Sequence, residues 1–246
     1  MTEEARKFRQ VPWIRIGAEA VAVIASILIA FSLDAWWDGL QASPREQQYL
    51  VGLEQDFQAN QSDLRRTIQI QDTVLQSIQE LVRFGATTLP SPDADTVKRL
   101  IMRVFTDINV RFTPTIGTYQ ELRNTSNLHV LTNDSLRILL SDLDGAVRRV
   151  SRVEEGADDS WSRSVTEHLV TRLDLVGLLP KEMLGPDREL QLRPAGIDLS
   201  GLPRDRVFSN IMVGRLAATV VRLSMYRDLE VKTGEILSVL ERDLAH

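Results

Sequence analysis

The sequence of 246 residues contains no cysteine, which excludes a disulfide scaffold and any metal or redox centre built on thiolates. Its three histidines, His129, His168 and His246, do not form the spacing of zinc ligands, so we expect no metal site and no cofactor. A net charge of -5 without a basic stripe gives no support for nucleic-acid binding. The common phosphate-binding and hydrolase motifs are also missing, so we expect neither an enzyme nor an identifiable small-molecule substrate.

The most informative segment is an uncharged apolar run near the N-terminus, which reads AVAVIASILIAFSL over residues 20–33. With its flanks the run extends over residues 14–37, and a helix of that length rises about 36 Å at about 1.5 Å per residue. This is enough to cross a bilayer core of about 30 Å. Trp13 at one end and Trp36 with Trp37 at the other suit the two headgroup regions. The sequence therefore predicts one transmembrane helix with three interfacial tryptophan anchors.

Two other interpretations of this run stay open: a cleaved signal peptide and a buried helix of a soluble protein. A signal peptide also has a basic start and a short apolar run. However, Leu33-Asp34-Ala35 makes a poor cleavage site. We therefore favour an uncleaved anchor that contacts the lipid bilayer.

The basic residues predict the orientation of this anchor. Arg6, Lys7 and Arg9 precede the span and Arg15 lies at its N-terminal end, whereas Arg45 alone lies in the fifteen positions after Asp34. The positive-inside rule therefore predicts residues 1–13 in the cytoplasm and residues 43–246 on the other side of the membrane, in a periplasmic or extracellular location.

Two features within the span bear on association. Arg15 and Glu19 lie one helical turn apart, so we expect an intramembrane polar pair, with an inter-subunit contact or an ion path at Glu19 as alternatives. Small residues also recur at every fourth position, which lets a second membrane helix approach closely. These residues are Ala18, Ala22, Ser26 and Ala30.

The remainder of the chain is predicted to be helical, which gives an all-α fold. Gly39 offers a stop to the membrane helix, and Ser43, Pro44 and Glu46 form a helix start with a capping box. Proline and glycine signals then predict long helices over 43–84, 134–176 and 206–244, and shorter ones over 93–107 and around 119–122.

Each long helix carries an apolar stripe of the kind that packs against partner helices. In the first helix the stripe is Leu50, Leu53, Phe57, Leu64, Val74, Ile78 and Leu81, and Asn60, Thr67 and Gln71 take the intervening core positions. In the second it is Leu136, Leu140, Leu143, Val147, Val150, Ala157, Trp161 and Val165. In the third it is Leu216, Val220, Leu223, Leu229, Ile236 and Leu240.

Near-equal lengths of these helices predict an extended antiparallel bundle. The first long helix then leads away from the membrane and the second returns towards it. This arrangement places the connector over residues 85–131 at the membrane-distal end. The loop over residues 177–205, rich in proline and glycine, is expected at the membrane-proximal end.

Acidic residues cluster once, at Glu154, Glu155, Asp158 and Asp159. Their spacing puts like charges next to each other on one helix face, which suggests a cation site. We favour a solvated face, in which neighbouring arginines offset the charge.

Several local motifs resemble one family. After the span come Glu46-Gln47-Gln48-Tyr49-Leu50, Phe112-Thr113-Pro114, Tyr119-Gln120-Glu121-Leu122, Thr125-Ser126-Asn127-Leu128 and Asn133-Asp134-Ser135-Leu136. Together they resemble the uncharacterised bacterial single-span membrane proteins grouped as domain of unknown function 6090. The family usually shows Ser-Gly where this chain has Thr125-Ser126, a difference that affects the expected turn geometry. The resemblance implies a location in a bacterial inner membrane, with residues 43–246 in the periplasm, and a helical architecture. It carries over no catalytic residue.

These observations favour a structural scaffold or accessory subunit that acts as a homo-oligomer or with a membrane-protein partner. A periplasmic helical bundle that senses a ligand is the main alternative, because small molecules can bind between helices. An ion path and an unrecognised enzyme remain as further hypotheses.

Overall fold

The computed structural model describes residues 13–88, 90, 92–106, 110–170 and 199–245, without the side chains of residues 13–20, 33–43, 106 and 169. Every regular element within these ranges is a helix, which confirms the all-α fold class. The chain divides into two compact units, Met1–Tyr49 and Leu50–His246.

The first helix, α1, runs without interruption over Trp13–Ala86 and belongs to both units. The predicted stop at Gly39 and the new start at Ser43-Pro44 are therefore wrong. A proline inside a helix costs one backbone hydrogen bond and a steric clash. Starting a second helix instead costs a new nucleus and leaves terminal backbone groups without partners. The helix accordingly continues through Pro44.

The structure does not support the predicted single N-terminal membrane helix. The apolar helical segment described in α1 is Val21–Ser32, which is shorter than a span, because the rest of the predicted window has no described side chains. Among the described helices, the one long and apolar enough to cross a membrane by length and composition is α5, Arg206–Leu244. The N-terminal span therefore stays a prediction.

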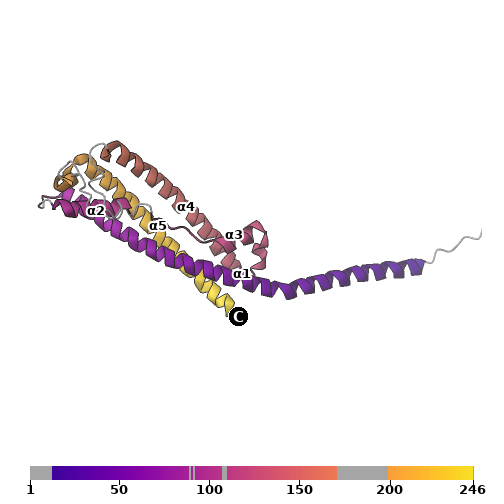
Figure 1. Ribbon diagram of the computed structural model, residues 1–246. Helices are drawn as coiled ribbons and strands as arrows, with labels where there is room; N and C mark the ends of the chain where they lie inside the picture. The colour runs from indigo at the N-terminus through magenta and orange to yellow at the C-terminus, as the bar shows by residue number, and fades with distance from the viewer. Residues whose placement is uncertain (1–12, 89, 91, 107–109, 171–198, 246) are drawn as a thin grey trace, which may run out of the picture. The chain divides into compact units, whose positions relative to one another are not determined.

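Three long helices build the second unit: the later part of α1, α4 over Asp134–Ser164 and α5 over Arg206–Leu244. Figure 1 shows them lying side by side. Shorter elements complete this unit: α2 (Ala94–Thr106), α3 (Gly117–Asn124), the 3-10 helices η2 (Asn127–Val130) and η6 (Leu199–Arg204), and the π-helical turn η3 (Val165–Leu169). The predicted helices over 93–107, 119–122 and 206–244 are thus confirmed to within a few residues. The predicted helix over 134–176 becomes π-helical after Ser164, and its last residues lie outside the described part of the chain.

Side-chain caps fix where these helices begin. The Asn133 side chain accepts a hydrogen bond from the Leu136 N–H at the start of α4. Asp205 accepts from the N–H groups of Val207 and Phe208 at the start of α5. Each cap gives a partner to backbone donors that the helix itself leaves unpaired.

The order of the helices in space differs from the prediction. Arg65 of α1 pairs with Glu230 of α5 at 3.1 Å and Asp72 pairs with Arg227 at 2.7 Å, so these helices are antiparallel. Asn133 next to α4 bonds Asp243 near the end of α5, and Tyr226 bonds Glu154, so α4 and α5 are antiparallel as well. The helices α1 and α4 are therefore parallel to each other, and the expectation that the second long helix returns along the first is wrong.

The described parts of the two connectors can be placed within the second unit, whereas their places relative to a membrane stay predictions. The described end of the 177–205 loop lies at the C-terminal end of α1, where a Cβ atom on Gly85 would come within 2.3 Å of the Pro203 carbonyl oxygen. The 85–131 connector returns instead to the opposite end, since Thr118 bonds Asp56 and Thr115 bonds Asn60. Extended chain covers about 3.3 Å per residue against about 1.5 Å for a helix, so a few extended residues carry the chain back along α1.

The core of the second unit follows the predicted stripe of α1. All seven apolar residues of that stripe and its three polar residues are buried. The end of the bundle near Gly85 holds an apolar cluster made by α1, α2, α4, η6 and α5. Its members include Val74, Ile78, Leu81, Val97, Ile101, Trp161, Leu202, Phe208 and Met212.

Candidate functional site

Two buried polar residues of α1, Asn60 and Gln71, bind the backbone of the extended segment over residues 110–116. The Asn60 side-chain amide donates to the Thr115 carbonyl oxygen at 2.8 Å and accepts from the Thr115 N–H at 2.7 Å. The Gln71 side chain donates to the Val110 carbonyl oxygen at 2.9 Å. An extended segment without a neighbouring strand needs such partners for its backbone groups. These polar positions therefore fix where the returning chain lies on α1.

The spacing of these contacts matches simple geometry. The helix rises about 16 Å between Asn60 and Gln71 at about 1.5 Å per residue. Extended chain covers the same distance between Val110 and Thr115 at about 3.3 Å per residue. The side chains of Asn60 and Gln71 thus bind the two ends of a straight extended segment.

A cluster of buried charged groups lies between α4 and α5. Arg215 and Arg222 of α5 have side chains that are 1% exposed, and Asp158 of α4 is 16% exposed. Arg222 donates to Asp158 Oδ1 at 3.0 Å. Arg111, from the extended segment, donates to Asp158 Oδ2. The Asp158 carboxylate therefore lies next to three guanidinium groups, those of Arg111, Arg215 and Arg222.

A second acid, Glu154, is buried one turn earlier on α4. It accepts a hydrogen bond from the Tyr226 hydroxyl group, which in turn accepts from the Phe112 N–H at 3.4 Å. Burial raises the pKa of Glu154 above its usual range, although the hydrogen bond from Tyr226 and the charge of Arg222 act in the opposite direction. Burial also raises the pKa of Tyr226, which keeps the phenol protonated.

Arg215 differs from the other two arginines in its partners. Its nearest carboxylate oxygen, Asp158 Oδ1, lies 3.8 Å away, which is too far for a hydrogen bond. None of its three side-chain nitrogen atoms has a hydrogen-bond partner among the described residues. Its guanidinium group lies 5.3 Å from the centre of the Trp161 ring. Burial and the charge of Arg222 lower the pKa of Arg215 to about 10, so it still carries its charge at neutral pH.

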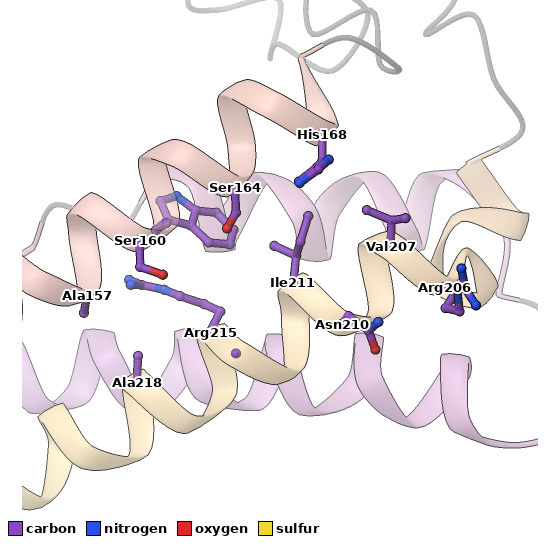
Figure 2. Close-up of a pocket in the computed structure, with 12 residues that line it drawn as sticks. Ala157, Ser160, Ser164, His168, Arg206, Val207, Asn210, Ile211, Arg215 and Ala218 are labelled. Carbon is purple, nitrogen blue, oxygen red and sulfur yellow. The ribbon is translucent and has the colours of Figure 1, made fainter.

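Arg215 lines a cleft of about 630 Å³ between the end of α4 and the start of α5. Figure 2 shows Arg215 extending from α5 towards α4, with Ser160 on the facing helix. The cleft has apolar walls from Trp161, Ile211 and neighbouring small residues. Its polar groups are Ser160, Ser164, His168, Arg206, Asn210 and Arg215. The described residues around it include no carboxylate, so the cleft is cationic.

The predicted membrane-segment residues are only partly described. The side chains of Trp13, Arg15, Ala18, Glu19, Trp36 and Trp37 lie outside the described residues, so their predicted roles stay predictions. Ala22, Ser26 and Ala30 are described and exposed. The Ser26 hydroxyl group donates to the Ala22 carbonyl oxygen at 2.7 Å, within its own helix.

The structure agrees with the predicted solvated face for two of the four residues in the acidic cluster. Glu155 and Asp159 are exposed, in agreement with a solvated face, whereas Glu154 is buried and Asp158 faces arginines of α5. The expectation of a fully solvated face is therefore wrong. No group of side chains suited to a metal ion occurs in the part of the chain that the structure describes.

Sequence reasoning missed Arg215, Thr219 and Arg222 as core residues. Together with Phe208, Met212, Leu223 and Tyr226 they continue one helical face of α5, and all are buried. Their spacing could have revealed them, but a stripe chosen by apolarity passes through Val220, which is 48% exposed. The sequence signal is that the buried face of α5 keeps its helical period through Arg215, Thr219 and Arg222, although these residues are polar.

The fold and this site define a class of protein: an all-α bundle with a polar, ion-paired core and a cationic cleft at one end. Residues 19–152, more than half of the chain, match the model of a family of unknown function, DUF6090. The chain belongs to that family. No curated protein and no solved structure is significantly similar to it.

Proposed function

We propose that this protein is anchored in a bacterial inner membrane by residues 14–37 and serves there as a helical scaffold or accessory subunit. The observation that carries this proposal is the exposure of α1 over residues 21–32, where every residue is exposed and none is charged. A helix that is apolar on all sides needs an apolar environment on all sides. Lipid supplies one.

Transfer of this exposed apolar surface from water into lipid contributes a large favourable free energy. Seven large apolar side chains in this stretch are at least half exposed, and burying such a side chain contributes about 1.5–3 kcal/mol. Covering all seven is therefore worth about 10–20 kcal/mol. These residues are Val21, Val23, Ile24, Ile27, Leu28, Ile29 and Phe31.

The helix α5 is a less suitable anchor, although it passes the test of length and composition. Its buried face carries Arg215 and Arg222, and Arg222 pairs with Asp158 of α4. Exposed Arg227 pairs with Asp72 of α1. Charges inside a span are costly, whereas in the bundle Arg222 and Arg227 have partners. We therefore assign α5 to the core of the second unit and the anchor to α1.

Two uncovered apolar surfaces support association as part of this function. In the first unit, Ala22, Ser26 and Ala30 offer small side chains at four-residue spacing. In the second, Val213, Val220 and Val221 of α5 are each 48% exposed. Apolar surface of this kind marks contacts with other proteins, here further copies or a membrane-protein partner.

Charge insertion tests the anchor. The double substitution Ile24→Arg with Leu28→Arg puts two charges into the proposed span, at a cost of about 3 kcal/mol each. Val51→Arg with Gln55→Arg places the same charges at the same spacing on exposed positions of α1 in the second unit. After alkaline carbonate extraction we expect the wild type and the control pair in the membrane pellet and the first pair in the supernatant. Wild-type protein in the supernatant would refute the anchor.

Association needs a separate test. Blue-native electrophoresis and crosslinking after mild solubilisation should show an oligomer or a complex with another membrane protein. A monomer without any partner would contradict the scaffold function even if the anchor is correct.

A second candidate function is ligand sensing, which the cationic cleft between α4 and α5 favours. Clefts of this size between helices are typical binding sites for small molecules. A thermal-shift screen of the full-length protein tests this candidate, and a screen without any stabilising compound would contradict it.

A further inference from the structure

We propose that the cleft between α4 and α5 binds a small organic anion, with its acidic group at Arg215 and its apolar body against Trp161 and Ile211. The acidic group is a carboxylate, a sulfonate or a phosphate ester. This inference rests on the second candidate function, ligand sensing, and names its ligand class. It does not depend on the membrane anchor.

The first argument is the balance of charge. Arg111, Arg215 and Arg222 bring three positive charges to the single carboxylate of Asp158. The other nearby acid, Glu154, is bonded to Tyr226, and its raised pKa favours the neutral form more than usual. Positive charge therefore exceeds negative charge in this part of the interior, and a buried excess charge is unfavourable without a counterion.

The second argument is the lack of hydrogen bonds at Arg215. A guanidinium group has five N–H donors in a planar fork that matches a carboxylate or a phosphate. Arg222 and Arg111 occupy the two oxygen atoms of Asp158, and the Arg215 nitrogen atoms have no hydrogen-bond partner among the described residues. Buried donors without partners are rare in folded proteins. An acidic ligand would supply the missing acceptors.

The third argument is the lining of the cleft, which suits an anion with an apolar part. Arg206 and His168 add basic groups around the cleft, and Ser160 and Asn210 add neutral donors. Trp161 and Ile211 provide apolar surface next to them. A volume of about 630 Å³ lies within the usual range of small-molecule sites, about 300–1,000 Å³.

Arg215 forms the inner end of this cleft. Its side chain is only 1% exposed although it lines the cavity, and Figure 2 shows its guanidinium group directed towards the helix that carries Ser160. A ligand in the cleft reaches the N–H groups after a rotation about the outer torsions of the arginine side chain. Because Asp158 Oδ1 is 3.8 Å away, this rotation breaks no hydrogen bond.

The test measures binding of 2-naphthoate to the purified full-length protein in phosphatidylcholine nanodiscs by isothermal titration calorimetry, with empty nanodiscs as the reference. Neutral 2-naphthylmethanol has the same ring without the charge, and inorganic phosphate has the charge without the ring. We expect 2-naphthoate to bind at least about tenfold more tightly than either, since a charge-assisted bidentate contact contributes this much. No binding of 2-naphthoate, or equal affinity for the neutral ring, would overturn the proposal.

Variants locate the site. Arg215→Met keeps the length of the side chain and removes its charge, so we expect at least about tenfold weaker binding of 2-naphthoate and an unchanged or higher thermal midpoint. A Cβ atom on Gly214 meets nothing within 4 Å, so Gly214→Leu fits and fills part of the cleft. Gly156→Leu is the matched control, because Gly156 is equally open but lies outside the cleft. Wild-type affinity in the Gly214 variant would overturn the proposed place of binding.

The source of the acidic group is tested by repeating the titration in nanodiscs that contain phosphatidylglycerol. Weaker binding of 2-naphthoate there identifies a lipid headgroup as a competitor at the same site, and unchanged binding identifies a soluble anion. Carbonate extraction of the membranes from which the protein is purified reports on the anchor independently. Failure of the binding test and failure of the anchor can therefore be distinguished.

Discussion

Replacing Asn60 with leucine tests how the extended segment is held on α1. The side chain is 2% exposed, and its amide makes two hydrogen bonds to the backbone of Thr115, at 2.8 and 2.7 Å. Leucine removes both bonds and keeps a side chain of similar size. A buried polar group left without a partner costs about 1–3 kcal/mol. Since Thr115 itself is exposed, water compensates part of this loss.

The expected loss for Asn60→Leu is therefore about 2–4 kcal/mol in the free energy of unfolding. In a unit of this size it corresponds to a thermal midpoint lower by about 5–15 °C. Circular dichroism of the full-length protein measures the midpoint. Hydrogen exchange should also show faster exchange at the Thr115 N–H than in the wild type.

Gln55→Leu is the control for this substitution, because Gln55 is an exposed amide side chain on the same helix. We expect a change within about 0.5 kcal/mol for it. If Asn60→Leu is as stable as the wild type, or no less stable than the control, the polar residues of α1 do not anchor the returning chain.

Three further predictions concern single residues of the second unit. Asp158→Asn leaves three arginines without their carboxylate and should cost about 2–4 kcal/mol in urea unfolding, whereas Asp159→Asn on the exposed side should change stability by less than about 0.5 kcal/mol. The pKa of Glu154 is raised above 4.5 in the folded protein, so its contribution to stability is present below that pH and is lost as the pH rises. Glu154→Gln should therefore become more stable relative to the wild type between pH 5 and pH 8, and a constant difference would contradict the assignment. Ser126 has a φ of 59°, a left-handed conformation that glycine adopts without strain, so Ser126→Gly should raise the midpoint by the equivalent of about 0.5–1 kcal/mol, and a lower midpoint would show that the turn does not strain the serine.

The sequence predicted the buried face of α1 well because that face keeps one period through its whole length. Asn60, Thr67 and Gln71 were placed in the core by position rather than by polarity, and all three are buried. The role of Asn60 and Gln71 could not be predicted, since their backbone partners belong to a segment with no helical or strand pattern. The prediction of how the helices are ordered in space was wrong for the same reason. A return by extended chain along α1 leaves no periodic signal in the sequence.

The buried arginines of α5 show a second limit of prediction from the sequence. A stripe chosen by apolarity gave Val220, and the structure buries Thr219 and Arg222 in its place. Burial of an arginine depends on a distant carboxylate, here Asp158 of α4, and such a pairing follows from tertiary structure alone. The cationic cleft could not be predicted either, because only the tertiary structure shows that Arg215 lines it without a hydrogen-bond partner.

We propose that the second unit lies across the membrane from the N-terminus, and the lack of native cysteine allows a direct test of this topology. A single cysteine at exposed Ser141 of α4 can be labelled with a membrane-impermeant maleimide in intact spheroplasts, and a single cysteine at Thr2 marks the other side. The account predicts full labelling at position 141 before lysis and labelling at position 2 only after lysis. Labelling at position 141 that appears only after lysis would contradict it.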